Sequence, residues 1–243
     1  MRIALISDLH GNEIALEAVL ADATAAGVDQ IACLGDVATL GPQPAAVLAR
    51  LRDLGCVCIL GNHDEFLVDP ELIHTYTEAP IIVDAVAWSR AQLAQPQLEF
   101  VRSFEARHVC DLGGESTLLL FHGSPRSHME DVLATTPADA LDECLAGHVA
   151  TVMAGGHTHV QMLRQHRGTL LVNPGSVGMP FKEYVGGRAP TVLAHAEYAI
   201  VEGSRSGVRV DLRRVALDRA ALLAAARASA ENPLARMLAA NYA

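Results

Sequence analysis

Lysine, aromatic residues and long apolar runs are scarce in this sequence. Lys182 is the only lysine, aromatic residues make up 4%, and 28 acidic residues against 18 basic ones give a formal net charge of −10. Basic surfaces capture a phosphate backbone, and a chain with a pI of about 5.5 offers none. We therefore do not expect long nucleic acids as substrates or partners.

Membrane spans, signal peptides and disulfides are not expected either. No apolar run approaches the roughly 20 residues that a transmembrane helix needs. The apolar residues 3–6 are followed too soon by Asp8 and His10 for a signal peptide. The five cysteines are an odd number and lie mostly in apolar runs, so we predict reduced thiols. These features indicate a cytoplasmic location and no membrane partner.

Apolar residues are abundant, at 51% of the chain, and they recur in short runs. Because no linker divides the chain, we expect one domain over residues 1–243. In the first half the runs alternate with amphipathic stretches, which is typical of parallel strands joined by crossover helices. The expected strands span residues 2–6, 30–34 and 57–60, and the expected helices span residues 12–26, 44–54, 82–94 and 96–104.

The second half is richer in predicted strands. Hairpins are expected at residues 107–121, 162–172 and 196–215, with a helix over 137–145, a strand over 151–154 and two alanine-rich helices at the end. The pattern predicts an α/β fold in which two sheets face each other with helices outside. The apolar C-terminal helices could pack against the same chain or another, so a homo-oligomer stays open.

Polar groups gather at the ends of five predicted strands, where an apolar run breaks into glycine beside Asp, Asn or His. These groups are Asp8 and His10, then Asp36, then Asn62 with His63 and Asp64, then His122, and finally His157 with His159. Loops at strand ends bring side chains from distant parts of a chain to one place. We therefore predict one polar site.

The chemistry of these side chains predicts divalent cations. Nitrogen and oxygen ligands without a thiolate suit Mn first, with Fe, Zn, Ni and Mg as alternatives, and exclude copper(I) and iron–sulfur clusters. A carboxylate can bridge two cations, whereas a neutral imidazole nitrogen binds one. Asp36 stands alone at a central strand end between two ligand sets, so it is the predicted bridge.

The ordered blocks resemble the calcineurin-like metallophosphoesterase superfamily over residues 3–178. The blocks are Asp8-x-His10, Gly35-Asp36, Gly61-Asn62-His63-Asp64, His122-Gly123 and Gly156-His157-x-His159. Gly41-Pro42 and the segment 173–178 are similar to the small bacterial and archaeal phosphodiesterase branch. The resemblance implies a four-layer α/β/β/α sandwich with a dinuclear metal site at the edge of the paired sheets.

The resemblance also implies a role for each residue. One metal ion would be bound by Asp8, His10 and His159. The other would be bound by Asn62, His122 and His157, with Asp36 between them. A hydroxide bridging the two ions would attack the phosphate, and His63 would donate a proton to the leaving alkoxide.

One departure from the family narrows the expected substrate. Protein phosphatases of this superfamily carry a second Asp followed by Arg shortly after the bridging Asp, and residues 37–42 contain neither. A small phosphodiester or nucleotide is therefore expected as substrate, with Arg126 as the candidate phosphate ligand. Two alternatives stay open: a phosphomonoesterase or protein phosphatase acting at the same site, and a non-catalytic scaffold that has kept the fold.

Other polar residues have structural interpretations. Asp64 is expected to cap a helix, with support of His63 as the alternative, and Asn12 either caps the first helix or lies beside phosphate. The segment 173–178 is either a tight turn or part of the site. Six histidines outside the blocks are expected to be structural, namely His74, His108, His128, His148, His166 and His195.

Overall fold

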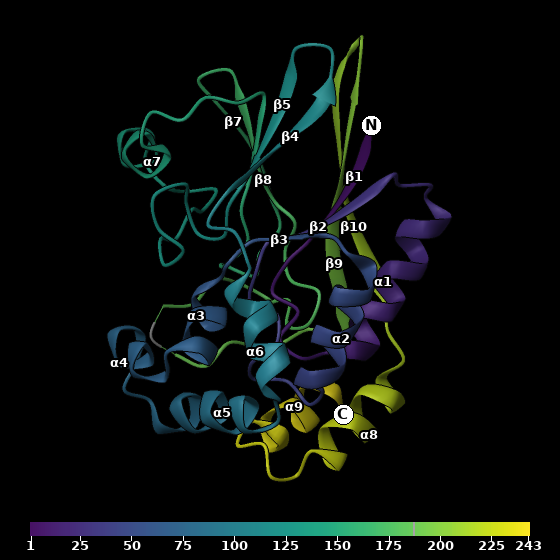
Figure 1. Cartoon of the computed structure of the whole chain (residues 1–243), viewed down its shortest axis with the longest axis vertical. Coiled ribbons are helices and arrows are strands. Elements are labelled where there is room, and N and C mark those ends of the chain that lie inside the picture. The colour runs from purple at the N-terminus through teal and green to yellow at the C-terminus, as the bar shows by residue number, and fades with distance from the viewer. Residues whose placement is uncertain (187) are drawn as a thin grey trace.

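Two five-stranded sheets form the centre of the molecule (Figure 1). The structure is a computed structural model, and it describes residues 1–186 and 188–243. The first sheet has the order β10-β9-β1-β2-β3, and the second has the order β4-β5-β6-β8-β7. The first comprises β1 (Arg2–Ile6), β2 (Gln30–Cys33), β3 (Val57–Cys58), β9 (His195–Ser204) and β10 (Gly207–Ala216). The second comprises β4 (His108–Gly113), β5 (Ser116–Leu120), β6 (Val152–Ala154), β7 (Met162–His166) and β8 (Thr169–Asn173).

The predicted crossover units are present in the first sheet. Strands β1, β2 and β3 pair in parallel and are joined by α1 (Glu13–Ala25) and α2 (Pro44–Leu54). Asn12 caps α1, because its side-chain oxygen accepts the backbone N–H of Ala15 at 3.1 Å. Pro44 stands in the first turn of α2, and Gly55 ends that helix with a left-handed φ of 61°.

The sheets and helices stack in four layers. Leu5 and Ala32 of the first sheet pack with Leu120 and Val172 of the second in one apolar cluster between the sheets. Helices α1 and α2 cover the outer face of the first sheet together with α6 (Gln95–Arg102). Helix α7 (Ala138–Leu145) packs on the outer face of the second sheet through Leu141. The α/β sandwich expected from the sequence is confirmed.

The remaining helices lie at the end of the molecule opposite the tip of the β4–β5 hairpin (Figure 1). They are α3 (Asn62–Val68), a 3₁₀ turn (Pro70–Leu72), α4 (Ile73–Tyr76), α5 (Pro80–Ala91), α8 (Arg219–Ala228) and α9 (Ala235–Tyr242). Ile73, Val86 and Leu238 share one buried cluster, so α4, α5 and the C-terminal helices pack together. None of the helices described is both long and apolar enough to cross a bilayer.

Several predicted boundaries were wrong near residue 60. The third strand ends at Cys58 rather than at residue 60, and α3 begins directly at Asn62, where a helix cap at Asp64 but no helix range was predicted. The predicted helix 82–94 runs from Pro80 to Ala91. A strand of two residues followed by a helix gives no clear periodicity, so the polar block at 61–64 concealed the helix.

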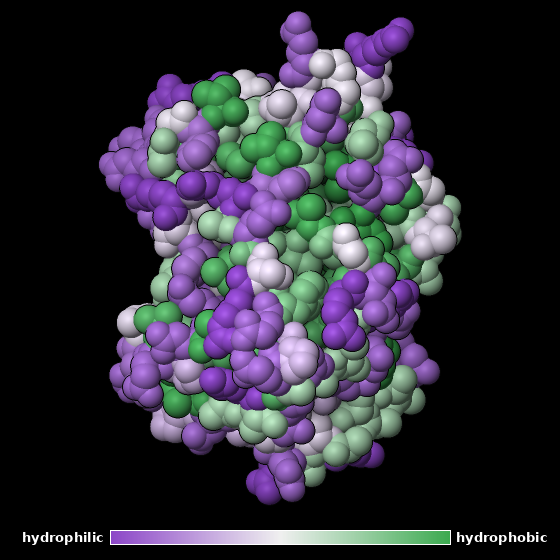
Figure 2. All heavy atoms as spheres, in the orientation of Figure 1, coloured by the Kyte–Doolittle hydropathy of each residue, from purple (hydrophilic) through white to green (hydrophobic). Residues whose placement is uncertain are grey.

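The surface in view is mainly hydrophilic, with hydrophobic residues gathered across its middle (Figure 2). The polar residues of the five sequence blocks are not part of such a surface, because Asp8, Asp36 and Asn62 are each at most 1% exposed. The five cysteines are free thiols, as predicted, and two of them are buried.

Candidate metal centre

The backbone is strained where the predicted ligands stand. Eight described residues other than glycine have a positive φ, and five of them are Asp8, His10, Asp36, His157 and His159, with φ between 42° and 69°. Such conformations are uncommon for these residue types, and they cluster at functional sites. The strained turns point the side chains beyond the strand ends toward one another.

Glycine in the blocks leaves room for the carboxylates. A Cβ atom on Gly61 would lie 2.1 Å from an Asp36 carboxylate oxygen, and one on Gly156 would lie 2.6 Å from an Asp8 carboxylate oxygen. The carboxylates instead meet backbone N–H groups: His63 donates to Asp36 at 2.9 Å and His157 donates to Asp8 at 3.1 Å. Close approach of backbone to carboxylate therefore explains the recurrent glycine.

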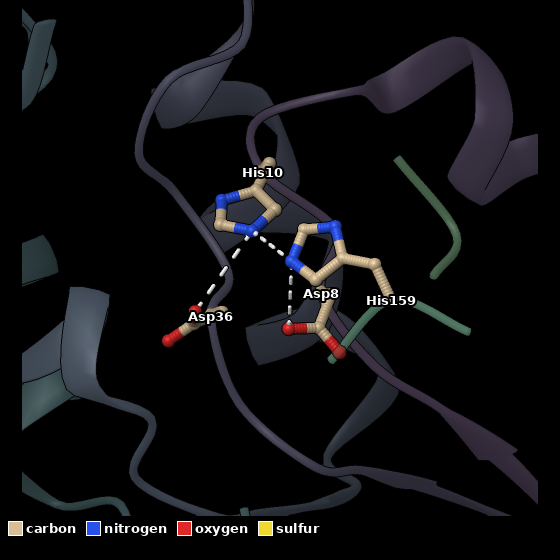
Figure 3. Close-up of side chains that lie close together, drawn as sticks. All are labelled: Asp8, His10, Asp36 and His159. Atoms are coloured by element: carbon tan, nitrogen blue, oxygen red, sulfur yellow. Dashed lines mark hydrogen bonds and ion pairs between the residues drawn. The ribbon is translucent and has the colours of Figure 1, made fainter. Parts of the chain in front are cut away.

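One group of ligand atoms comes from Asp8, His10, Asp36 and His159 (Figure 3), and these atoms all lie within 4.8 Å of one another. The Nε2 atoms of His10 and His159 are 3.1 Å apart. His159 Nε2 lies 3.3 Å from Asp8 Oδ1, and His10 Nε2 lies 3.8 Å from Asp36 Oδ2. Two imidazole nitrogens and two carboxylates thus converge on one point.

A second group shares Asp36 with the first. Ligand atoms of Asp36, His122 and His157 lie within 4.8 Å of one another. His122 Nε2 is 3.4 Å from Asp36 Oδ1 and 3.2 Å from the side-chain oxygen of Asn62. Asp36 therefore occupies the position between two clusters that the sequence predicted for it, and Asn62 belongs to the second cluster.

Hydrogen bonds behind the histidines set which ring nitrogen faces the clusters. His159 Nδ1 donates to the carbonyl of Met179 at 2.7 Å, and His122 Nδ1 donates to the carbonyl of Leu34 at 2.6 Å. Because a carbonyl only accepts, Nδ1 carries the hydrogen and a neutral ring presents a lone pair at Nε2. His10 Nδ1 lies 3.2 Å from the hydroxyl of Thr39, which can donate or accept, so this contact orients the ring without setting its tautomer.

The electrostatics of the buried site fit cations. Asp8 Oδ1 is buried without a hydrogen-bond partner. Burial and the facing His159 lower the pKa of His10 to about 3, so its ring is neutral at pH 7 and can give an electron pair to a cation. Burial opposes ionisation of Asp36, but His122 and His63 lower its pKa well below the usual range. Burial opposes protonation of His122 and His159, but Asp36 raises the pKa of His122 to about 10 and Asp8 raises the pKa of His159. These two rings would release a proton when a cation binds, and the combined set of carboxylates and imidazoles suits Mn, Fe, Zn and similar divalent ions.

Comparison with known proteins identifies the family of this chain. The model of the calcineurin-like phosphoesterase superfamily domain matches residues 1–198. The chain belongs to this superfamily. Its enzyme class is accordingly that of metal-dependent hydrolases of phosphoric esters, and the resemblance inferred from the sequence blocks is confirmed.

Three relatives illustrate the match. An uncharacterized protein of Methanocaldococcus jannaschii is 30% identical over 193 residues, covering 73% of this chain and 76% of that one. The phosphodiesterase YfcE of Escherichia coli is 27% identical over 190 residues, covering 74% and 81%. The crystal structure of a metallophosphoesterase from Sphaerobacter thermophilus is 29% identical, covers 99% of both chains and superposes with a TM-score of 0.75.

Asp64 supports the phosphoesterase site through the backbone. Its buried carboxylate accepts the N–H groups of Asp36 at 2.7 Å, Val37 at 2.9 Å and Gly61 at 3.0 Å. The bond from Gly61 caps α3, so the predicted cap is confirmed. The other two bonds hold the turn that carries Asp36, a role that sequence reasoning missed because the partner lies 27 residues or more away.

His63 lies beside the ligands. It is 5% exposed, its ring packs edge-on against His10 with centroids 5.2 Å apart, and its Nδ1 has no hydrogen-bond partner. Burial lowers its pKa below the usual value for histidine. The ring also lines the cavity that opens from the clusters, so it is accessible to a substrate.

The segment 173–178 lies behind the ligands as a supporting turn. The Ser176 hydroxyl and the Gly178 N–H both donate to the carbonyl of Asp8, at 2.7 Å and 3.0 Å. Asn173 donates to the carbonyl of Gly156 at 2.6 Å. Asn12, besides capping α1, donates to the carbonyl of Gly178 at 3.1 Å. These bonds fix the loops that carry the ligands.

Five of the six histidines outside the blocks have side-chain contacts of the structural kind expected of them. Ion-pair contacts join His74 to Glu78, His108 to Glu105, His128 to Glu65, His166 to Asp142 and His195 to Glu197. His148 is exposed. The two clusters are therefore formed by the histidines of the sequence blocks.

Arg126 is held away from the clusters. Its Nε donates to Glu130 at 2.7 Å, and that carboxylate also accepts the hydroxyl of Ser124 at 2.6 Å. A phosphate-binding role for Arg126 stays a prediction. Among the described residues that line the cavity, the basic side chain outside the histidines is Arg188. Arg188 stands in no recognisable motif. The only sequence signal for a role of Arg188 in the cavity is its position in a segment without an assigned role.

Proposed function

We propose that this phosphoesterase hydrolyses phosphodiesters of small molecules at a dinuclear site. Asp8, His10 and His159 would hold one divalent cation, and Asn62, His122 and His157 would hold the other, with Asp36 shared. The single observation that carries the proposal is the membership of Asp36 in both ligand groups. Mn²⁺ is the first candidate ion, because the donor set combines carboxylates, an amide and imidazoles.

When bound, two such cations supply a hydroxide at neutral pH and neutralise the phosphoryl oxygens that gain charge during displacement. The residues of the chain orient the reaction. The hydrogen bonds of His122 and His159 to backbone carbonyls fix their ring positions, and the carboxylate of Asp36 is held by the N–H of His63. His63 would donate its proton to the departing oxygen.

The charge of the cavity favours a diester over a monoester. A phosphomonoester carries up to two negative charges, whereas a diester carries one. Beside the histidines, the described lining offers one arginine, Arg188, and it also includes the acidic side chain of Asp131. Of the two ester types, the singly charged one is less opposed by such a lining. The phosphodiesterase name of the YfcE relative supports the same choice.

The proposal is tested with bis(4-nitrophenyl) phosphate and added Mn²⁺. We expect turnover by the wild type and loss of turnover in Asp36→Ala and Asn62→Ala, with folding of each variant checked by circular dichroism. An absence of turnover with Mn²⁺, Fe²⁺, Zn²⁺, Ni²⁺ and Mg²⁺ would reject the proposal in favour of a non-catalytic scaffold. A faster reaction with 4-nitrophenyl phosphate would instead identify a phosphomonoesterase.

A further inference from the structure

The cavity extends far beyond the metal ligands. It has a volume of about 560 Å³, which lies within the range of about 300–1,000 Å³ typical of sites for small organic ligands. Its outer walls come from residues 76–82, from residues 179–186 and 188–192, and from the start of α9 and the turn before it. Leu234 and Met237 supply the last wall, and they lie after residue 198, where the superfamily match ends.

The wall is apolar and aromatic at the cavity mouth. Tyr76, Ile81 and Tyr184 line the cavity although 48%, 46% and 39% of their surfaces are exposed. Large apolar side chains left exposed around a concave site are typical of ligand-binding surfaces. Burial raises the pKa of both tyrosines to about 12, so both are neutral rings at physiological pH.

Both tyrosines connect to groups of the proposed reaction. The Tyr76 ring packs edge-on against His63, with centroids 5.8 Å apart and planes at 74°. The Tyr184 hydroxyl donates to Asp131, and another oxygen of that carboxylate lies 3.4 Å from Nε2 of His157. A group that contacts these rings is therefore next to the reacting phosphate.

Polar groups among the apolar residues indicate what kind of substituent fits. Thr77, Asp131 and Arg188 also line the cavity. Asp131 and Arg188 have partners within the chain, Tyr184 and Glu183, but each can make further hydrogen bonds. An alkyl chain could make none of these bonds, whereas a nucleobase with its sugar offers both a flat face for the tyrosines and hydrogen-bonding edges.

We propose that one ester substituent of the substrate is a nucleoside-type group, a flat aromatic base on a sugar, bound between Tyr76 and Tyr184. This inference rests on the proposed phosphodiesterase function and assigns its substrate class. The specificity-determining parts of the enzyme are then residues 76–82, which run from the end of α4 into the first turn of α5, the segment around Tyr184 and the C-terminal helix α9.

The test compares three diesters that share the 4-nitrophenolate leaving group and differ in the retained group: methyl, octyl and thymidin-5′-yl. Because the leaving group is the same, the ratio of their kcat/KM values reports binding of the retained group. Stacking of a base on an aromatic side chain is typically worth roughly five- to 150-fold. We expect the thymidyl ester to exceed the methyl ester by about tenfold or more.

Variants separate the ring from the hydroxyl group. Tyr76→Ala and Tyr184→Ala should each lower the thymidyl-to-methyl ratio by about fivefold or more, whereas Tyr184→Phe should keep it. Val149→Ala is the matched control, since Val149 is 90% exposed and outside the lining of the cavity. Thermal unfolding curves establish that each variant is folded.

Three outcomes would overturn the inference in distinguishable ways. Hydrolysis of all three esters at similar kcat/KM would reject the nucleoside assignment and leave the phosphodiesterase proposal standing. Preference for the octyl ester would show that the cavity binds an aliphatic ester substituent instead of a nucleoside-type one. No hydrolysis of any ester by the folded, metal-loaded protein would reject the proposed function itself.

Discussion

Replacing His63 by asparagine should slow the reaction by an amount that depends on the leaving group. Asparagine is of similar size and polarity but cannot donate an acidic proton. His63 is 5% exposed and its Nδ1 has no hydrogen-bond partner, so the substitution breaks no hydrogen bond of that atom. The proton of a general acid matters most when the departing oxygen is strongly basic.

The size of the effect follows from general acid catalysis. Proton donation typically contributes about 10²- to 10⁴-fold, which corresponds to about 3–5 kcal/mol of transition-state stabilisation. We expect this loss in kcat for methyl phenyl phosphate, whose phenolate is basic. For methyl 4-nitrophenyl phosphate, whose leaving group is stable as an anion, we expect a loss below about tenfold.

The pH profile gives a second measure of the same residue. Burial lowers the pKa of His63 below the usual value of histidine, so its acid form decreases as the pH rises toward neutrality. The kcat for the phenyl ester should therefore fall with rising pH in the wild type and lose this dependence in His63→Asn. The 4-nitrophenyl ester should show neither effect.

The assay is release of the two phenols under saturating Mn²⁺, followed by absorbance. His74→Asn is the control, because His74 is an exposed histidine paired with Glu78, and it should leave both rates unchanged. Equal losses for the two esters in His63→Asn would refute the assignment of His63 as proton donor and indicate a role in positioning.

Three further predictions concern the site and the fold. Asp36→Ala should retain less than one Mn²⁺ per chain where the wild type retains about two, measured by plasma mass spectrometry after desalting, and His166→Ala should match the wild type. Asp64→Ala leaves buried backbone N–H groups unpaired. It should therefore lower the free energy of unfolding by about 3 kcal/mol or more, measured by urea unfolding, and weaken Mn²⁺ binding by about 10- to 100-fold, measured by titration calorimetry. An unchanged Mn²⁺ affinity would contradict the supporting role of Asp64. The hydrogen bond from Arg213 lowers the pKa of Asp22. The stabilising effect of this pair, about 1 kcal/mol, is therefore present above the pKa of about 3.9 of Asp in the unfolded chain and is lost as the pH falls through the lower pKa of the folded chain. The stability difference between wild type and Asp22→Asn should vanish in acid, and a difference that persists there would show that the pair is not its cause.

Part of the fold was readable from the sequence because the signals are local. Periodicity and turn residues located the first two strands of the parallel unit and the helices α1 and α2, including the Gly55 stop, and the cap at Asn12 was one of two expected roles for that residue. The failure at residues 57–68 also has a local cause. A strand of two residues and a helix that begins inside the polar block carry too few apolar positions to define a period.

The candidate ligands could be named from the sequence alone, because they stand in short blocks in which glycine lies beside Asp, Asn or His. Only the tertiary structure decided how the blocks meet. Asp64 reaches across the chain to the turn of Asp36, and Tyr76, Tyr184 and Met237 come together in one cavity from three distant segments. The local backbone does not dictate which residue type stands at Tyr76, Tyr184 or Met237. The role of these residues therefore arises from packing between distant parts of the chain.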